Sequence, residues 1–344
     1  MEKIDFVVTW VDGNDPAWIA EKRKWQSMST GAMCETGDAN ADCRYRSDGE
    51  SLHYWFRAVE KFAPWVNMIH FVTCGQKPEW LDENNPKLHL VDHKDFIPAK
   101  FLPTFNANTI EMNFHRLEAL SERFVLFNDD MFLLQPVGQD FFFRNGDPVL
   151  DTDLRISPFL GYNNWSRFVF NGYCLVNQSF NTRQTIWKNR CKWFNVKALG
   201  LKRVRQNLLC YLANKTVPVG AYSHVANPHL KSSLEEVWQK WPDAMDNTSS
   251  SKFRTDDKVN QWMLCAWNQA KGRFYPVHEK NRGQNVEISS NTLGWICQLI
   301  REQSVPQICI NDTQNNDTNF AVSMARICEA FDAILPEKSS FEKY

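Results

Sequence analysis

Residues 124–134 read FVLFNDDMFLL, and the prediction of the fold starts from this stretch. The run Phe124–Phe127 is apolar and aromatic, which is typical of a buried strand. Asn128, Asp129 and Asp130 follow it directly. Because burying two unpaired carboxylates is costly, we expect them where the strand emerges from the sheet. In open α/β sheets, ligands bind at that carboxyl edge.

Adjacent carboxylates at a strand end have two interpretations. They can hold a hard cation such as Mg²⁺ or Mn²⁺, which in turn binds phosphate oxygens. They can equally be solvated side chains of an ordinary turn, since Asp is favoured there. Two further predicted strands are also followed by an aspartate: Asp12 follows Ile4–Val11, and Asp312 follows Ile308–Ile310.

Strand and helix patterns alternate along the first part of the chain. The strands are predicted over Ile4–Val11, Met68–Thr73, Leu88–Val91 and the stretch ending at Asp129, and the helices over Pro16–Trp25, Ser51–Phe62 and Asn108–Ser121. This alternation predicts an α/β fold with a mostly parallel, Rossmann-like or GT-A-like sheet flanked by helices. Fold class alone decides no chemistry.

Charge is distributed unevenly along the chain. From Leu154 to Leu234 there is no Asp or Glu, while the same stretch holds twelve Lys and Arg residues. The formal net charge of the whole chain is −1, so the remainder carries −13. We therefore predict an N-terminal α/β part over 1–153, a basic, mainly helical insertion over 154–234, and a C-terminal part over 235–344.

The basic stretch has several possible partners. It can dock on an acidic part of the same chain, or it can bind a nucleotide diphosphate, a phosphate-bearing polymer or an anionic membrane surface. No nucleic-acid-binding module is recognisable, so nucleic acid is not expected as a partner. The helical pattern over Thr182–Ala213 is interrupted near Gly200.

Several local patterns lead to further expectations. Asn145-Gly146 predicts a hairpin within Phe141–Leu150. Ser232 and Glu235 form a capping-box pattern for a helix over Ser232–Trp241. We also predict a polar linker over Asp246–Ser251, helices over Asp257–Ala270 and Phe320–Leu335, and a long loop over 28–50.

The location of the protein is predicted from its cysteines and its apolar runs. The ten Cys residues form no CxxC pair, so a structural zinc site is not expected. No signal peptide opens the sequence, and no apolar run approaches the roughly 18–20 residues of a membrane span. We expect a cytoplasmic protein with reduced thiols, peripheral to the inner face of the membrane through the basic stretch.

Four blocks of sequence together carry a family resemblance. They are IDFVVTWVDG at Ile4–Gly13; FAPWV, VTCGQKPEWL, VDHKDFIP, LPTFNANTIE and FNDDMFL within Tyr45–Leu133; His224 with Lys231 and Phe253-Arg254; and CIND at Cys309–Asp312. The chain resembles the Stealth family of sugar-1-phosphate transferases. That family includes bacterial capsule and exopolysaccharide phosphotransferases and the catalytic core of the N-acetylglucosamine-1-phosphotransferase that tags lysosomal enzymes.

The resemblance implies a reaction. A hexose 1-phosphate, for example N-acetylglucosamine 1-phosphate, is transferred from a UDP-sugar to a hydroxyl of an oligo- or polysaccharide acceptor. A phosphodiester forms and UMP leaves. Phosphoryl transfer depends mostly on positioning and charge neutralisation, and Mg²⁺ or Mn²⁺ is the expected cofactor.

The resemblance also implies roles for individual residues. Asp129 and Asp130 serve the metal or the acceptor hydroxyl, His224 is a general base or phosphate ligand, and Arg254 stabilises the transferred phosphoryl group. Spacing alone would not single out His224 or Arg254. The expected metal ligands are Asp130 and Asp312, and the expected substrate-binding residues are Asp12, Arg46, Asn106, Asn108, Glu111, Asn128 and Asn311.

Two other functions are compatible with the same residues. A metal-dependent glycosyltransferase would also use a UDP-sugar and strand-end carboxylates, but it would release UDP. No clean D-x-D is expected after a core strand, although Asp129-Asp130 could replace it. A non-catalytic carbohydrate- or polyanion-binding protein would use the Trp-containing, acid-free stretch, since the flat faces of Trp side chains stack on sugar rings.

Overall fold

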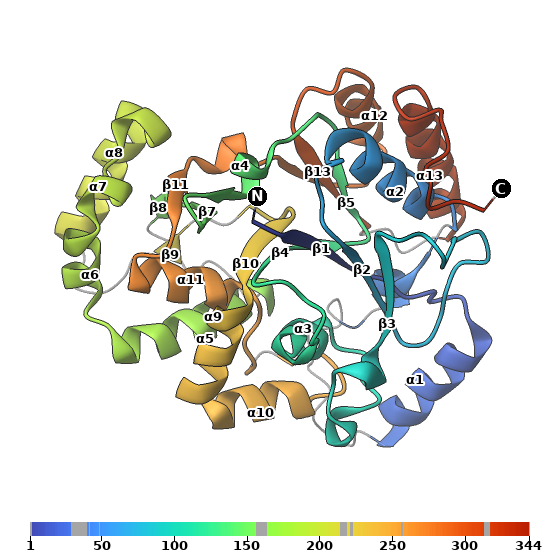
Figure 1. The fold of residues 1–344 in the computed structure, drawn as a ribbon, viewed down its shortest axis with the longest axis horizontal. Coiled ribbons are helices and arrows are strands. Elements are labelled where there is room, and N and C mark those ends of the chain that lie inside the picture. Colours follow the sequence, from blue (N-terminus) through green and yellow to red (C-terminus); the bar gives the residue numbers. More distant parts are fainter. Residues whose placement is uncertain are drawn as a thin grey trace.

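The computed structural model describes residues 2–28, 40, 42–47, 49–155, 164–213, 219–220, 223–255, 257–312 and 317–343. Within these ranges, five strands form a central sheet in the order β10-β4-β1-β2-β3 (Figure 1). Four of them are parallel: β1 (Ile4–Thr9), β2 (Ile69–Thr73), β3 (Leu88–Asp92) and β4 (Arg123–Asn128). The edge strand β10 (Asn227–Leu230) is antiparallel to β4. The predicted α/β fold with a mostly parallel sheet is confirmed.

The central strands are mostly apolar because both faces of the sheet are buried, and the buried exceptions Asp5 and His70 contact each other. In β1, Phe6 and Val8 belong to the core on one face, while Val7 belongs to the core on the other. The first core is closed by α2 (Ser51–Phe62), α12 (Leu293–Arg301) and α13 (Asp317–Asp332), and the second by α9 (Lys231–Lys240), α10 (Pro242–Ser250) and α11 (Trp262–Lys271). α1 (Pro16–Met28) lies at the β3 end of the molecule (Figure 1).

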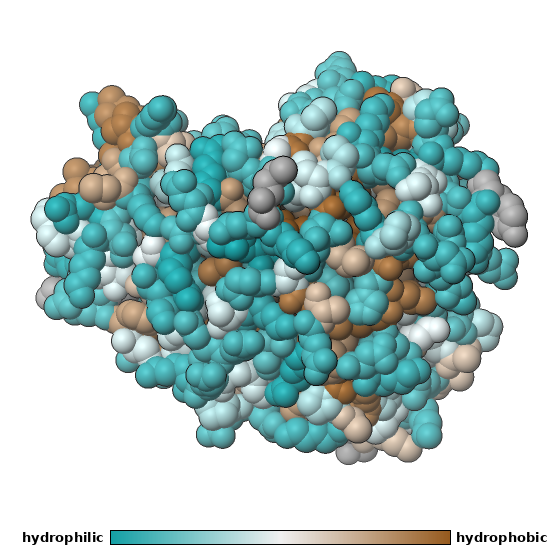
Figure 2. All heavy atoms as spheres, in the orientation of Figure 1, coloured by the Kyte–Doolittle hydropathy of each residue, from teal (hydrophilic) through white to brown (hydrophobic). Residues whose placement is uncertain are grey.

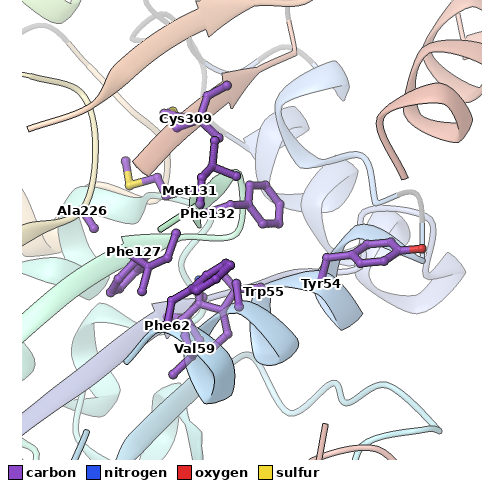
Figure 3. Close-up of a cluster of buried hydrophobic side chains, with 14 of the residues drawn as sticks. Tyr54, Trp55, Val59, Phe62, Phe127, Met131, Phe132, Ala226 and Cys309 are labelled. Carbon is purple, nitrogen blue, oxygen red and sulfur yellow. The ribbon is translucent and has the colours of Figure 1, made fainter. Parts of the chain in front are cut away.

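The FVLFNDDMFLL stretch forms two strands that belong to different sheets. β4 ends at Asn128, Asp129 and Asp130 form a turn, and β5 (Met131–Leu133) pairs antiparallel with β13 (Gln307–Asn311). β12 (Gln284–Glu287) runs parallel to β13 on its other side. Figure 3 shows the apolar side chains that pack where these strands meet α2, among them Trp55, Val59, Phe62, Phe127, Met131, Phe132 and Cys309.

A second small sheet joins the basic stretch to the rest of the chain. β7 (Asp147–Asp151) lies between β6 (Phe143–Arg144) and β11 (Tyr275–Val277), and β8 (Leu154–Arg155) pairs with β9 (Val219–Gly220). The short helix α4 (Gln139–Phe142) precedes β6. The N-G hairpin is confirmed, because Asn145 and Gly146 both have positive φ, 53° and 82°.

The basic stretch is helical, as predicted. It forms α5 (Asn164–Ser179), α6 (Thr182–Lys188), α7 (Arg190–Trp193) and α8 (Val196–Ala213), and Gly200 interrupts α8 with φ 77° and ψ 158°. α5 packs on α11, and β10, near the end of the same stretch, lies in the central sheet. No helix among the described residues combines the length and the apolar character that crossing a bilayer requires.

The helix predicted over Asn108–Ser121 is wrong in length. α3 spans only Ala107–Glu111, and a short 3₁₀ helix follows at Phe114–Arg116. The reason is local: the Asn113 side chain donates to the Thr109 carbonyl at 2.8 Å, while the Asn113 backbone N–H donates to Ile110 instead. A side chain that takes the carbonyl of the preceding turn competes with helix propagation.

Two smaller expectations are also wrong. The predicted linker over Asp246–Ser251 lies mostly within α10, which begins at Pro242, a residue well suited to a first helical position. α9 has no capping box, because the Ser232 N–H and hydroxyl both donate to the Glu122 carboxylate of a distant segment. Much of the loop predicted over 28–50 lies outside the described residues.

Candidate active site

The register of the parallel strands places their carboxyl ends at one edge of the sheet. Thr9 of β1 pairs with Asn128 of β4, and Thr73 of β2 pairs with Asp92 of β3. Asp12 therefore leaves β1 close to the place where Asp129 leaves β4. The sheet edge expected from the sequence exists, and Asp12, Asp129 and Asp130 follow strands that end there.

The end of β13 meets the turn between β4 and β5. Cys309 lies opposite Met131, and the Ile310 N–H donates to the Asp130 carbonyl at 2.9 Å. The Cys309 thiol, which is fully buried, hydrogen-bonds the Asp130 carboxylate. Asn311 and Asp312 therefore leave β13 beside Asp130, which joins two predicted parts of the site.

The Asp130 carboxyl has a buried oxygen atom without a hydrogen-bond partner among the described residues, Oδ1. Burial raises the pKa of this carboxyl, and the nearby His224 and Arg44 oppose the rise. An orphaned carboxylate oxygen at a ligand-binding edge is a natural contact for a cation or a hydroxyl group. Asp129 is half-buried beside it.

His224 faces Asp130 closely enough for each to influence the other's ionisation. Burial lowers the pKa of His224, and the Asp130 charge opposes that shift. His224 Nδ1 is buried and has no hydrogen-bond partner within the described ranges. The ring lies 6.4 Å, centroid to centroid, from that of Trp262. A neutral imidazole with an unoccupied nitrogen is suited to accept a proton.

Arg254 belongs to the same electrostatic neighbourhood. Its positive charge acts on His224 and on the buried Glu111. The backbone around Arg254 is held by Asn40, whose side chain accepts from the Arg254 N–H at 3.0 Å and donates to its carbonyl at 2.9 Å. The structure thus brings together Asp130, His224 and Arg254, which lie far apart in the sequence.

Three of the predicted substrate-binding residues, Asn106, Asn108 and Glu111, belong to α3 and its N-cap. Asn106 caps the helix by accepting from the Asn108 N–H at 3.1 Å, and its amide donates to the carbonyls of Ser251 and Phe253. The Asn108 amide nitrogen is buried and, among the described residues, unpaired. Burial raises the pKa of Glu111 to about 7, against the effect of Arg254.

Arg46 and Asp312 form an ion pair at the same edge. Arg46 Nε and Nη2 both donate to Asp312 Oδ2, at 3.1 and 2.6 Å, and the guanidinium lies 4.5 Å from the centre of the Phe320 ring. The Asn311 side-chain amide donates a hydrogen bond to the Asn285 side chain. Asp12 accepts from the Asn14 N–H at 2.9 Å, and its own N–H donates to Gln76.

Arg44 was not identified from the sequence. It is exposed in the 3₁₀ helix Asp42–Tyr45, and its charge acts on both Asp130 and His224. The neighbouring Tyr45 packs so closely on Gly13 that a Cβ there would lie 1.9 Å from its carbonyl oxygen. The signal in the sequence is the pair of arginines that flank Tyr45 in an otherwise small and polar loop.

A second acidic motif supports the His224 loop. Asp151-Thr152-Asp153 is a D-x-D that begins at the last residue of β7, a strand of the small sheet and not of the central sheet. Asp151 accepts from the Ser223 N–H at 2.7 Å, and Arg282 donates to the Ala226 carbonyl at 2.9 Å. Both carboxylates of the motif are buried and accept from backbone N–H groups, Asp151 from Ser223 and Asp153 from Glu279, while Oδ1 of each has no hydrogen-bond partner among the described residues.

A metal site is not evident from the carboxylates alone. Over the ranges that the structure describes, no group of three or more His, Cys, Asp and Glu side chains is arranged to hold a metal ion. Asp312, one of the two predicted ligands, is paired with Arg46. The orphaned Oδ1 of Asp130 fits a hard cation, so the metal remains a prediction.

The fold and this gathering of carboxylates, imidazole and guanidinium groups define an α/β protein with a polar, enzyme-like site at the carboxyl edge of its sheet. Family models for Stealth protein conserved regions 1, 2 and 3 match residues 2–29, 44–149 and 223–268. Asp12 lies in the first region, Asp130 in the second, and His224 and Arg254 in the third.

Full-length relatives agree with these matches. The chain is 38% identical over 343 residues to the capsular polysaccharide phosphotransferase WcwK of Streptococcus pneumoniae, with all of both chains covered. It is 39% identical over 344 residues to the receptor polysaccharide phosphotransferase WefC of Streptococcus oralis, with 99% of this chain and all of WefC covered. The chain therefore belongs to the Stealth family and is a phosphotransferase.

Among solved structures, the galactosyltransferase LgtC is similar with a TM-score of 0.39 and 9% identity, covering 97% of this chain and 98% of that chain.

Proposed function

We propose that this protein transfers a sugar 1-phosphate from a UDP-sugar to a hydroxyl of a growing capsular or exopolysaccharide. The observation that carries the proposal is the convergence of Asp130, His224 and Arg254 at one edge of the sheet. The relatives WcwK and WefC, a capsular and a receptor polysaccharide phosphotransferase, support a phosphotransferase that acts on polysaccharide.

In the proposed reaction, the acceptor hydroxyl oxygen attacks the β-phosphorus of the donor. The bond between that phosphorus and the bridging oxygen breaks, UMP leaves with the bonding electron pair, and a phosphodiester forms. His224 takes the proton of the acceptor hydroxyl through its unpaired Nδ1 or binds a phosphate oxygen. Arg254 binds the oxygens of the transferred group, on which charge accumulates.

The remaining residues bind and orient the substrates. Asp129 or Asp130 accepts a hydrogen bond from the acceptor hydroxyl. Asn106, Asn108 and Glu111 surround the donor sugar, with the unpaired Asn108 amide available to a sugar oxygen. The nucleotide is bound by Asp12, Arg46, Asn128 and Asn311.

Mg²⁺ or Mn²⁺ would be held by Asp130 and Asp312 and would neutralise the pyrophosphate. We place the enzyme in the cytoplasm, where UDP-sugars are available.

The test is incubation of the protein with a panel of UDP-sugars and an oligosaccharide primer, scored for UMP, for UDP and for a phosphodiester product. We expect UMP and phosphodiester in equal amounts, and loss of both when a chelator is added. Release of UDP would instead identify a glycosyltransferase, and binding without turnover a carbohydrate-binding protein.

Variants connect the reaction to the site. His224→Gln and Arg254→Lys should each lower kcat by about 100-fold or more, because general bases and phosphoryl-stabilising groups contribute on that scale. His115→Gln is the matched control, since His115 is also half-buried and its Nδ1 has no partner among the described residues, but it packs on Trp238 outside this site. Near-full activity of both site variants would contradict the assignment.

A further inference from the structure

The helices of the basic stretch carry most of the exposed large apolar side chains of the described chain. Seven of its ten exposed large apolar side chains lie between residues 164 and 213: Phe170, Trp187, Val196, Leu201, Leu208, Leu209 and Leu212. Figure 2 shows brown, apolar atoms gathered at the end of the molecule where α8 lies in Figure 1. Apolar side chains clustered in this way usually mark an interaction surface.

Apolar side chains occupy two opposite sides of α8, one buried and one exposed. Leu199 and Cys210 are buried against the body of the protein, together with the fully buried Asn207. Leu201, Leu208 and Leu212 recur at helical spacing on the opposite side, where they are between 44% and 58% exposed. Packing within the chain explains only the first face.

Cations surround the exposed face. Arg183, Lys188, Arg190, Lys197, Lys202 and Arg205 are all exposed. None of the six forms an ion pair with a described residue, whereas Lys192 and Arg203 of the same helices pair inward with Asp147 and Asp153. Residues 154–234 contain no Asp or Glu, so this stretch itself supplies no carboxylate to neutralise the exposed cations.

Aromatic rings join the apolar and cationic groups. Trp187 of α6 stacks on Tyr211 of α8 with 6.2 Å between ring centroids, and Arg190 and Arg183 lie over these two rings at 5.3 and 5.2 Å. Trp and Tyr rings with neighbouring Arg side chains are typical of groups that sit at the level of lipid headgroups.

We propose that the exposed face of α6, α7 and α8 binds the surface of an anionic phospholipid bilayer. The leucines of α8 enter the boundary between headgroups and acyl chains, and the surrounding Lys and Arg side chains contact the headgroups. Charge complementarity selects this partner: a soluble polyanion would leave the leucines in water, and a neutral bilayer would leave the cations unused. The inference does not depend on the proposed reaction.

The experiment is sedimentation of the full chain with vesicles of phosphatidylcholine alone or mixed with phosphatidylglycerol, at low and high salt. The variant Leu208→Asn/Leu209→Asn/Leu212→Asn removes the apolar face without touching the core. The matched control is Trp295→Asn/Val322→Asn, which changes exposed apolar residues on α12 and α13. Thermal unfolding of each variant verifies that the fold is retained.

We expect binding to anionic vesicles that is at least tenfold weaker for the α8 variant, unchanged for the control, and weakened by salt. Equal binding to neutral and anionic vesicles, or equal binding by the α8 variant, would overturn the proposal. So would a dimer in solution that the α8 substitutions dissociate, since the face would then join two copies of the chain. UMP release with a water-soluble primer should be the same for all three proteins, which separates this test from that of the reaction.

Discussion

Arg46 and Asp312 are 266 positions apart in the chain, and two hydrogen bonds to one carboxylate oxygen join them. Their side chains are only 12% and 14% exposed. The pair connects the polar segment before α2 to the residue that follows β13. Because both segments border Asp130, this contact helps to define the shape of the site.

The energy of this pair can be measured with a double-mutant cycle. Arg46→Ala and Asp312→Ala should each destabilise the protein by about 1–3 kcal/mol, because each leaves a partly buried charge unpaired. The double variant should lose less than the sum of the two, and urea unfolding of the four proteins gives the coupling energy. Additive losses would show that the pair contributes nothing.

The same variants test the proposed cation. Asp312→Ala should raise the concentration of Mg²⁺ or Mn²⁺ required for half-maximal activity, because it removes a proposed ligand. Arg46→Ala should not raise it, since it removes a positive charge from the same carboxylate. The measurement is a metal titration of UMP release, and equal metal requirements in the two variants would exclude Asp312 as a ligand.

Asp151 should act on catalysis through the position of the His224 loop. Asp151→Ala removes the acceptor of the Ser223 N–H and a negative charge that acts on the buried Arg282, so we expect a loss of about 1–3 kcal/mol in stability. Asp151→Asn keeps an acceptor of the same shape and should be milder. In both variants, kcat should fall more than KM changes, which steady-state kinetics can measure. If the variants lose stability but keep their kcat, Asp151 serves the fold and does not position His224.

Glu111 should make stability depend on pH. Burial raises its pKa in the folded protein to about 7, above an unfolded value near 4.5. The raised pKa of Glu111 therefore adds to the free energy of unfolding fully below pH 4.5. This stabilisation is lost as the pH rises to about 7. Relative to Glu111→Gln, which cannot ionise, the wild type should lose about 3 kcal/mol over this interval. Urea unfolding at pH 5, 6, 7 and 8 measures the difference in unfolding free energy between the two proteins. This difference should not change with pH if Glu111 has an ordinary pKa.

Glu342 should have the opposite dependence. Burial alone would raise its pKa, but hydrogen bonds from Arg57, Ser339 and His53 outweigh burial and lower the pKa to about 2. The ionised Glu342 carboxylate therefore stabilises the folded protein above pH 4.5, and this stabilisation is lost as the pH falls toward 2. Glu342→Gln should cost about 2 kcal/mol at pH 7 and progressively less toward pH 3. Glu337→Gln, in the same terminal segment, is the control. If Glu342→Gln loses the same stability at every pH, the loss comes from altered packing and not from the charge.

Local patterns predicted several elements accurately. The apolar face of Ser51–Phe62 gave α2 with the observed bounds, and the break at Gly200 and the N-G hairpin were found because their backbone requires positive φ. Predictions failed where a side chain formed a hydrogen bond that the periodicity of the sequence does not show, locally at Asn113 and over a long distance at Glu122. Asn113 ends α3 through a bond of its own, and Glu122 replaces the expected cap of α9.

The sequence by itself determined the α/β class, the strand ends that carry Asp12, Asp129 and Asp312, and the acid-free basic stretch. These depend on residue type and short-range periodicity, which act within a few turns of chain. Only the tertiary structure decided that Asp130, His224 and Arg254 share one neighbourhood, that Arg44 joins them, and that α8 exposes an apolar side. Strand register and helix packing bring together residues that are far apart in the chain, and no local pattern encodes that distance.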